Sequence, residues 1–191
     1  MRISVFGLGY VGAVSAACLA ADGHTVVGVD KNQTKVDLIN RGKSPIIEAG
    51  VDELMADAHR QKRLTASTDA GIAIGQTDLS LVCVGTPSER NGSLDLSHIR
   101  NVCQDMGAAL TALGRYHIVV IRSTVLPGTM RQVVIPALEA ASGRKAGPDF
   151  GVCFNPEFLR EGTAVKDYQH PPQTGVGENE RKGGSRVVEF E

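Results

Sequence analysis

A chain of 191 residues, 42% hydrophobic and 21% charged, is long enough for one α/β domain but too short for two full domains. No apolar run approaches the roughly 20 residues that cross a bilayer. A net charge of −1 without a basic cluster argues against nucleic acid and acidic membranes as partners. The first residues open on an apolar strand pattern rather than a secretory signal, so we expect a cytoplasmic protein.

Strand-like and helical segments alternate from the first residues onward. We expect strands at residues 3–6, 25–29, 79–84, 117–121 and 150–154, and helices at residues 11–22, 34–41, 50–60, 96–113 and 129–141. The strands are nearly continuous apolar runs, which is typical of strands buried on both faces. The sequence therefore predicts an α/β fold, a doubly wound and mainly parallel Rossmann sheet with helices on both faces.

The composition changes near the end of the chain. Between residues 171 and 186 only Val176 is a large apolar residue. Such a segment buries too little apolar surface to offset the entropy lost on ordering. We therefore expect one domain over residues 1–170 and a disordered, divergent tail over residues 171–191.

A glycine-rich motif follows the first strand and opens the first helix. In this motif Gly7 permits a tight turn, Gly9 leaves room for a pyrophosphate, and Gly12 lets helix and strand pack closely. The first amides and the positive dipole end of the following helix favour an anion. The motif predicts a dinucleotide site, although a GxGxxG sequence alone is weak support.

An acidic residue at the end of the second strand strengthens this prediction. Asp30 lies about twenty residues beyond the motif, where a carboxylate accepts both hydroxyls of an adenosine ribose. The same carboxylate would repel a 2′-phosphate, and the next positions supply Lys31 and Lys35 but no arginine. We therefore expect NAD rather than NADP. Lys35 is a candidate contact to the cofactor, with a solvated helix lysine as the alternative.

Two later strands end in hydroxyl residues that are candidates for the same crevice. Thr86 follows the strand at 79–84, and Thr124 follows the strand at 117–121. Ligands of doubly wound sheets bind at the carboxyl ends of the strands, so both side chains are expected to face the nicotinamide half of NAD. Local capping of the following turns is an equal alternative.

The motifs in combination resemble the UDP-glucose/GDP-mannose dehydrogenase family. They are FGLGYVG at 6–12, GVD at 28–30, VGTPS at 84–88, RSTVLPGT at 122–129 and NPEFLREG at 155–162. The similarity runs from Met1 to about Tyr168. The phrases KSPIIE at 43–48, NGSLDL at 91–96 and NPEFLREGTAVKDY at 155–168 look most like the branch that acts on GDP-mannose. That branch makes GDP-mannuronate, a precursor of alginate.

The resemblance implies an oxidoreductase that converts the C6 alcohol of a nucleotide sugar to a carboxylate in two hydride transfers to NAD. It assigns NAD contacts to Tyr10, Val11, Asp30, Lys35, Thr86 and Thr124. It assigns Glu161 to the sugar and to the attack of water that releases the acid, a task that needs a base within hydrogen-bond reach. Glu161 and Thr124 therefore form the catalytic set carried by this chain.

The family's nucleophilic cysteine lies in a later FGGSCLPKD-type segment that this sequence does not contain. The four cysteines present, Cys18, Cys83, Cys103 and Cys153, have no CxxC pairing and no evident activating base, so we expect buried thiols and no metal site. Cys153 is expected to lie nearest the crevice. We expect the chain to bind NAD without oxidising GDP-mannose.

Three alternatives stay open. The first is a UDP-glucose 6-dehydrogenase, because the residues that recognise the base lie mainly outside this chain. The second is a non-catalytic NAD-binding module. The third, a β-hydroxyacid dehydrogenase, shares the GLGxxG opening but not the RSTVLPGT and NPEFLREG segments. The resemblance also implies a homo-oligomer, but family dimers draw on a later helix, so the oligomeric state stays open.

Overall fold

The computed structural model describes residues 1–90, 92–171, 173 and 175–178. Within these residues the centre is a seven-stranded sheet of order β3-β2-β1-β4-β5-β6-β7. The strands are β1 (Arg2–Phe6), β2 (Thr25–Val29), β3 (Leu64–Ser67), β4 (Leu79–Val82), β5 (Ile118–Ile121), β6 (Gly151–Phe154) and β7 (Gly177–Glu178). The first six are parallel, and β7 runs antiparallel to β6.

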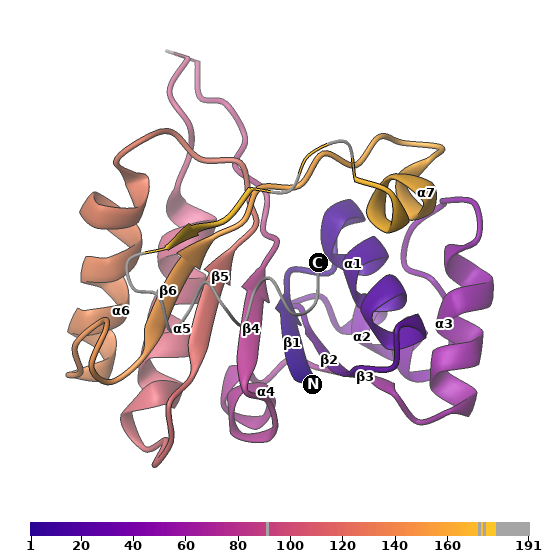
Figure 1. Ribbon diagram of the computed structural model, residues 1–191, viewed down its shortest axis with the longest axis horizontal. Helices are drawn as coiled ribbons and strands as arrows, with labels where there is room; N and C mark the ends of the chain where they lie inside the picture. Colours follow the sequence, from indigo (N-terminus) through magenta and orange to yellow (C-terminus); the bar gives the residue numbers. More distant parts are fainter. Residues whose placement is uncertain (91, 172, 174, 179–191) are drawn as a thin grey trace.

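Helices cover both faces of the sheet (Figure 1). One face carries α1 (Tyr10–Ala21), α2 (Gln33–Asn40), α3 (Val51–Arg60) and α7 (Ala164–Gln169), and the other carries α4 (Ala70–Gln76), α5 (Ser97–Thr111) and α6 (Ile135–Ser142). The predicted doubly wound, mainly parallel Rossmann fold is confirmed. In the part of the chain that the structure describes, no helix combines the length and apolar character needed to cross a membrane.

The alternation of side chains along the strands divides the core into two layers. Leu79 and Leu81 of β4 pack under α1, whereas Val82 packs under α4 and α5. Residues of β1 and β5 alternate in the same way, because successive side chains of a strand point to opposite faces. Apart from the exposed Arg2 at the start of β1, these strand residues are buried, which explains why their sequences read as mainly apolar runs rather than as alternating patterns.

Several elements differ from the sequence prediction. The strand β3 and the helices α4 and α7 were not predicted, because β3 is short and partly polar, α4 contains two glycines and α7 has only six residues. Asp69 gives the local signal for α4, since its carboxylate accepts hydrogen bonds from the amides of Gly71 and Ile72. The helix predicted at 129–141 starts instead with a π-helical turn, Met130–Val134, just before Pro136, whose missing N–H interrupts the regular hydrogen bonding.

Part of the predicted tail departs from the expectation of disorder. Gly177 and Glu178 form β7, whose partners in β6 are Phe154 and Cys153. The amide side chain of Asn155 also donates to the carbonyl of Gly175, at 3.1 Å. Backbone pairing, which the polar composition could not reveal, orders this stretch. The rest of that prediction, at residues 172, 174 and 179–191, lies outside the described residues.

A buried polar network beneath α4 joins β1, β4 and the residue that precedes β5. The hydroxyl oxygens of Ser4 and Ser80 lie 2.6 Å apart, and the Ser80 oxygen lies 2.8 Å from Nε2 of His117. Thr77 donates to Ser4 at 3.1 Å. Burial, together with the nearby Arg115 cation, lowers the pKa of His117 to about 4. The imidazole is therefore neutral in the folded protein at neutral pH.

The depressed pKa of His117 predicts a loss of stability in acid. The unfolded chain takes up this proton near the ordinary pKa of about 6.5, whereas the folded chain resists it until about pH 4. The free energy of unfolding should therefore fall between these pH values, by about 3 kcal/mol from this residue. Chemical denaturation of wild type and His117→Asn across this range measures the difference in slope.

His59→Asn, at an exposed position, is the control for replacing a histidine with asparagine. Comparing slopes removes the effect of acidic groups common to all three proteins. A His117→Asn variant with the wild-type dependence on pH would contradict the assignment.

Candidate cofactor-binding site

The glycine-rich turn brings the end of β1 against the start of α1. Gly7 adopts a φ of +91°, and its amide donates to the carbonyl of Val29 at 2.8 Å. A Cβ on Gly12 would overlap the carbonyl oxygen of Gly7. The turn therefore requires glycine at both positions, at the first for its backbone conformation and at the second for space.

Gly9 plays a different part in the same turn. It precedes the first residue of α1, and a Cβ built on it would meet no atom within 4 Å. The space beside Gly9 is thus open, and the first amides of α1 have no intrahelical partners. Open space next to amide donors and a positive helix end suits an anionic group such as a pyrophosphate.

The Asp30 carboxylate is fixed beside this turn. It accepts hydrogen bonds from the amides of Leu8 at 2.8 Å and Asn32 at 2.9 Å. The ammonium group of Lys35 lies 3.5 Å from the same carboxylate. A carboxylate has about four acceptor positions, so Asp30 keeps capacity for a further hydroxyl donor.

These groups line a groove with a volume of about 1130 Å³ at the carboxyl ends of the strands. Gly7, Gly9, Asp30 and Lys35 form one wall. Residues of α5 and of the loop between β4 and α5 form the other wall, and in Figure 1 this loop rises above the sheet. The structure thus brings the turn, the acidic residue and the lysine together. Val11 and Gly12 lie in α1 behind this wall and do not line the groove.

Thr86 and Thr124 lie close together because a hydrogen bond joins the two loops that carry them. The Thr86 hydroxyl donates to the backbone carbonyl of Thr124 at 2.9 Å. Neither residue lines the groove, whereas their neighbours Gly85 and Pro87 do. This bond joins two distant loops and is not the local capping that the sequence left open, and it adds no direct support for a ligand contact.

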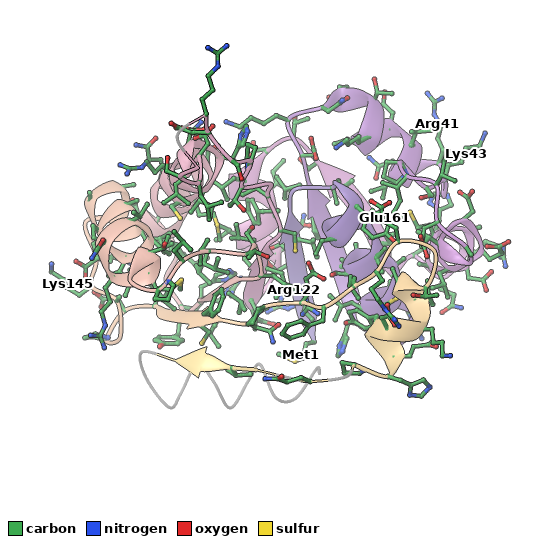
Figure 2. The ribbon with its side chains drawn as sticks, turned by 90° about the horizontal axis from the view of Figure 1, so that it is seen from above. Met1, Arg41, Lys43, Arg122, Lys145 and Glu161 are labelled. Carbon is green, nitrogen blue, oxygen red and sulfur yellow. The ribbon has the colours of Figure 1, made fainter. Side chains whose placement is uncertain are left out.

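A second hollow, of about 360 Å³, lies on the other side of the glycine turn. Tyr10, Glu48 and Glu161 are among the residues that line it. Figure 2 shows Glu161 on the loop between β6 and α7, well apart from Arg122 near the middle of the sheet. Tyr10 thus faces the side of the turn where Glu161 lies, and Glu161 itself is exposed.

Glu48 is a site residue that sequence reasoning missed. Its carboxylate accepts hydrogen bonds from the Tyr10 hydroxyl at 2.7 Å and from the amides of Gly162 at 2.8 Å and Ala164 at 3.1 Å. The Tyr10 hydrogen bond contributes most to lowering the pKa of Glu48. Burial, followed by the hydrogen bond to Glu48, raises the pKa of Tyr10. The only sequence signal was the position of Glu48 at the end of the KSPIIE phrase.

The loop that carries Glu161 is also held at its base. Asp167 in α7 accepts hydrogen bonds from the Arg160 guanidinium, the Arg160 amide and the Thr163 hydroxyl. The hydrogen bond from the Arg160 guanidinium is the main cause of the lowered pKa of Asp167. Glu161 therefore lies between two fixed points, Arg160 and Gly162.

The four cysteines are all buried. Cys83, rather than Cys153, lines the groove, which corrects the expectation from the sequence. Cys83 follows the last residue of β4, next to the glycine turn, whereas the Cys153 side chain packs in the layer under α1. Burial raises the pKa values of Cys18, Cys83 and Cys103 to about 12. These thiols are thus protonated at neutral pH and are poor nucleophiles.

Comparison with known proteins decides the family. Residues 1–190 match the UDP-glucose/GDP-mannose dehydrogenase family, NAD binding domain. GDP-mannose 6-dehydrogenase of Pseudomonas aeruginosa is 55% identical over 190 residues, which are 100% of this chain and 44% of that protein. The Azotobacter vinelandii GDP-mannose 6-dehydrogenase is 57% identical, over 98% of this chain and 43% of that protein. The chain belongs to the UDP-glucose/GDP-mannose dehydrogenase family.

Solved structures of family members agree with this assignment. A ternary complex of GDP-mannose dehydrogenase from Pseudomonas aeruginosa superposes with a TM-score of 0.98 at 55% identity, covering 100% of this chain and 44% of that one. A UDP-glucose dehydrogenase from Pyrobaculum islandicum gives 0.93 at 38% identity, covering 98% and 43%. The chain thus spans less than half the length of the relatives it matches.

The groove fits the cofactor of the family, NAD. The open space beside Gly9 accommodates a pyrophosphate against the start of α1, and the Asp30 carboxylate has capacity for ribose hydroxyls. The chain matches the NAD binding domain of this family over residues 1–190.

Substitution by alanine should affect different properties at the two glycines of the turn. Gly12→Ala should lower the free energy of unfolding by about 3 kcal/mol, because the overlap with the Gly7 carbonyl forces the backbone apart. Gly9→Ala should leave stability nearly unchanged but weaken NAD binding by about tenfold, since its methyl enters the space for the pyrophosphate. Denaturant unfolding and calorimetric titration measure the two effects.

Gly75→Ala, in α4, is the matched control because a Cβ there also meets no atom within 4 Å. This variant should keep both stability and NAD affinity. Equal loss of stability in the Gly9 and Gly12 variants would be inconsistent with the roles assigned to them.

Proposed function

We propose that this chain is the cofactor-binding part of a GDP-mannose 6-dehydrogenase, which oxidises GDP-mannose to GDP-mannuronate, an alginate precursor. The observation that carries the proposal is the glycine turn and the Asp30 carboxylate in one groove, joined by the hydrogen bond from the Leu8 amide. The identities of 55% and 57% to GDP-mannose 6-dehydrogenases favour GDP-mannose over UDP-glucose. The Haloferax volcanii UDP-glucose 6-dehydrogenase is 41% identical over 93% of the chain.

The proposal gives each residue of the groove a role. Gly7 and Gly12 form the turn, Gly9 admits the pyrophosphate, and the positive end of α1, which begins at Tyr10 and Val11, favours its negative charge. Asp30 accepts the ribose hydroxyls, and Lys35 holds that carboxylate in place. Thr86 and Thr124 hold the two loops at the nicotinamide end through their hydrogen bond.

Glu161 is proposed to act on the nucleotide sugar. Bound NAD supplies the hydride acceptor, and the residues of this chain bind and orient it. The Glu161 carboxylate is exposed on a loop fixed by Glu48 and Asp167, where it can meet a substrate and accept a proton from water. Its position on a fixed loop keeps this base at a constant distance from the turn that holds the cofactor.

The cellular setting and assembly belong to the same proposal. We propose a cytoplasmic location, in keeping with a nucleotide-sugar substrate, and a homo-oligomeric enzyme. Ile47, Leu126 and Phe158 are exposed apolar side chains, and surfaces of this kind are commonly covered in an assembled protein.

Calorimetric titration of the purified chain with NAD and NADP tests the cofactor site. NAD should bind, NADP should bind at least about tenfold more weakly, and Asp30→Ala should weaken NAD binding by about tenfold. The loss follows from removing the acceptor of the ribose hydroxyls.

Asp37→Ala serves as the control. Asp37 lies in the same helix as Lys35, but among the described residues its side chain accepts a hydrogen bond only from Gln33. This control should titrate like wild type. Absence of NAD binding by wild type would overturn the proposed cofactor role.

Turnover gives a second, independent outcome. The thiols of Cys18, Cys83 and Cys103 are buried with raised pKa values, so the chain offers no reactive thiolate among these three to hold the sugar aldehyde. The chain alone should produce no NADH from NAD and GDP-mannose. Absorbance at the NADH band measures this, and NADH formation that depends on GDP-mannose or on UDP-glucose would contradict the expectation and identify the substrate.

A further inference from the structure

An ion pair crosses the groove at the end where the ribose of NAD is proposed to bind. Lys31, the residue directly after Asp30, has its ammonium nitrogen 3.2 Å from the Asp105 carboxylate. Lys31 belongs to the loop after β2, and Asp105 belongs to α5. Both residues line the groove, so the pair joins its two walls.

The second lysine of this region is paired as well. The Lys35 ammonium lies 3.5 Å from the carboxylate of Asp30. Among the described residues that line the groove, Lys31 and Lys35 are the only lysines, and none is an arginine. Each of these two lysines therefore has a carboxylate partner. A third carboxylate in the groove, that of Asp69, caps α4. Both lysine ammonium groups of the groove are therefore paired before any ligand arrives.

The pairing of the lysines matters for the choice between two dinucleotides. NADP differs from NAD by a 2′-phosphate on the adenosine ribose, next to the hydroxyls that Asp30 is proposed to accept. A phosphate needs a cation close to that carboxylate, and Lys31 is the nearest residue along the chain that could supply one. Its ammonium is directed instead to Asp105 across the groove.

We propose that Asp105 is a positioning residue for cofactor specificity, which holds and neutralises Lys31 so that the groove disfavours NADP. This inference rests on the proposed NAD site and extends it from Asp30 to a residue on the opposite wall. Asp30 repels the 2′-phosphate directly, and Asp105 removes the cation that could offset that repulsion. The two carboxylates therefore act on the same phosphate by different routes.

The exposure of the pair makes the effect separable from folding. The side chains of Lys31 and Asp105 are 75% and 48% exposed. Ion pairs with this exposure contribute little to stability, so removing Asp105 should leave the thermal midpoint of the protein unchanged. A change in the ratio of NADP to NAD affinity would then report on cofactor recognition alone.

The test is a set of calorimetric titrations with NAD and NADP on the full chain carrying Asp30→Ala, alone and combined with Asp105→Asn. Freeing Lys31 should strengthen NADP binding by about three- to tenfold over Asp30→Ala alone, with NAD affinity unchanged. The gain should shrink at about 0.5 M salt, because the new contact is between exposed charges. Asp105→Glu in the same background keeps the carboxylate and should bind NADP like Asp30→Ala alone.

Asp57→Asn in the Asp30→Ala background is the matched control, since Asp57 pairs with Arg60 on α3, which does not line the groove. Suppose that wild type binds NAD but the double variant Asp30→Ala, Asp105→Asn binds NADP no more tightly than Asp30→Ala does. That result overturns this inference and leaves the proposed function standing. Failure of wild type to bind NAD overturns the proposed function and this inference together.

Discussion

The contact of Gly12 with the Gly7 carbonyl is the constraint on which the rest of the site depends. No side chain fits between them, so α1 begins directly at the end of β1. This approach places the start of α1 next to Gly9, which lines the groove, and brings the Leu8 amide to Asp30 just after β2. One steric requirement thus aligns a helix end, a turn and a carboxylate, three groups that a dinucleotide needs together.

The same helix links the groove to the second hollow. Residues Gly12–Ala20 of α1 are buried between the sheet and the helices α3 and α7, and most of them are small. Small side chains allow close packing on both sides, so the position of α1 is fixed. Tyr10 at its start then reaches Glu48, and Glu48 in turn holds the amides of Gly162 and Ala164. The glycine-rich turn and the loop that carries Glu161 are therefore parts of one rigid arrangement.

Charge and hydrogen bonding keep this arrangement in one protonation state near neutral pH. The hydrogen bond from Tyr10 favours the ionised form of Glu48 and lowers its pKa, while burial and the carboxylate raise the pKa of Tyr10. The phenol therefore remains a donor and the carboxylate remains an acceptor. Asp167 is held ionised in the same way by Arg160. The groups that position Glu161 thus do not change charge across the neutral range.

The sequence by itself determined the fold class, the glycine turn and the role proposed for Asp30, because these depend on apolar runs and on residues within one short βαβ segment. Only the tertiary structure decided that Glu48 bonds across 38 residues to Tyr10 and across 114 to Gly162, that Lys31 pairs with Asp105, and that residues 177–178 join β6. It also showed that Thr86 bonds Thr124 instead of lining the groove. Such contacts depend on how strands register and on how crossover helices pack. Those relations arise between segments far apart in the chain, and local patterns of residues do not specify them.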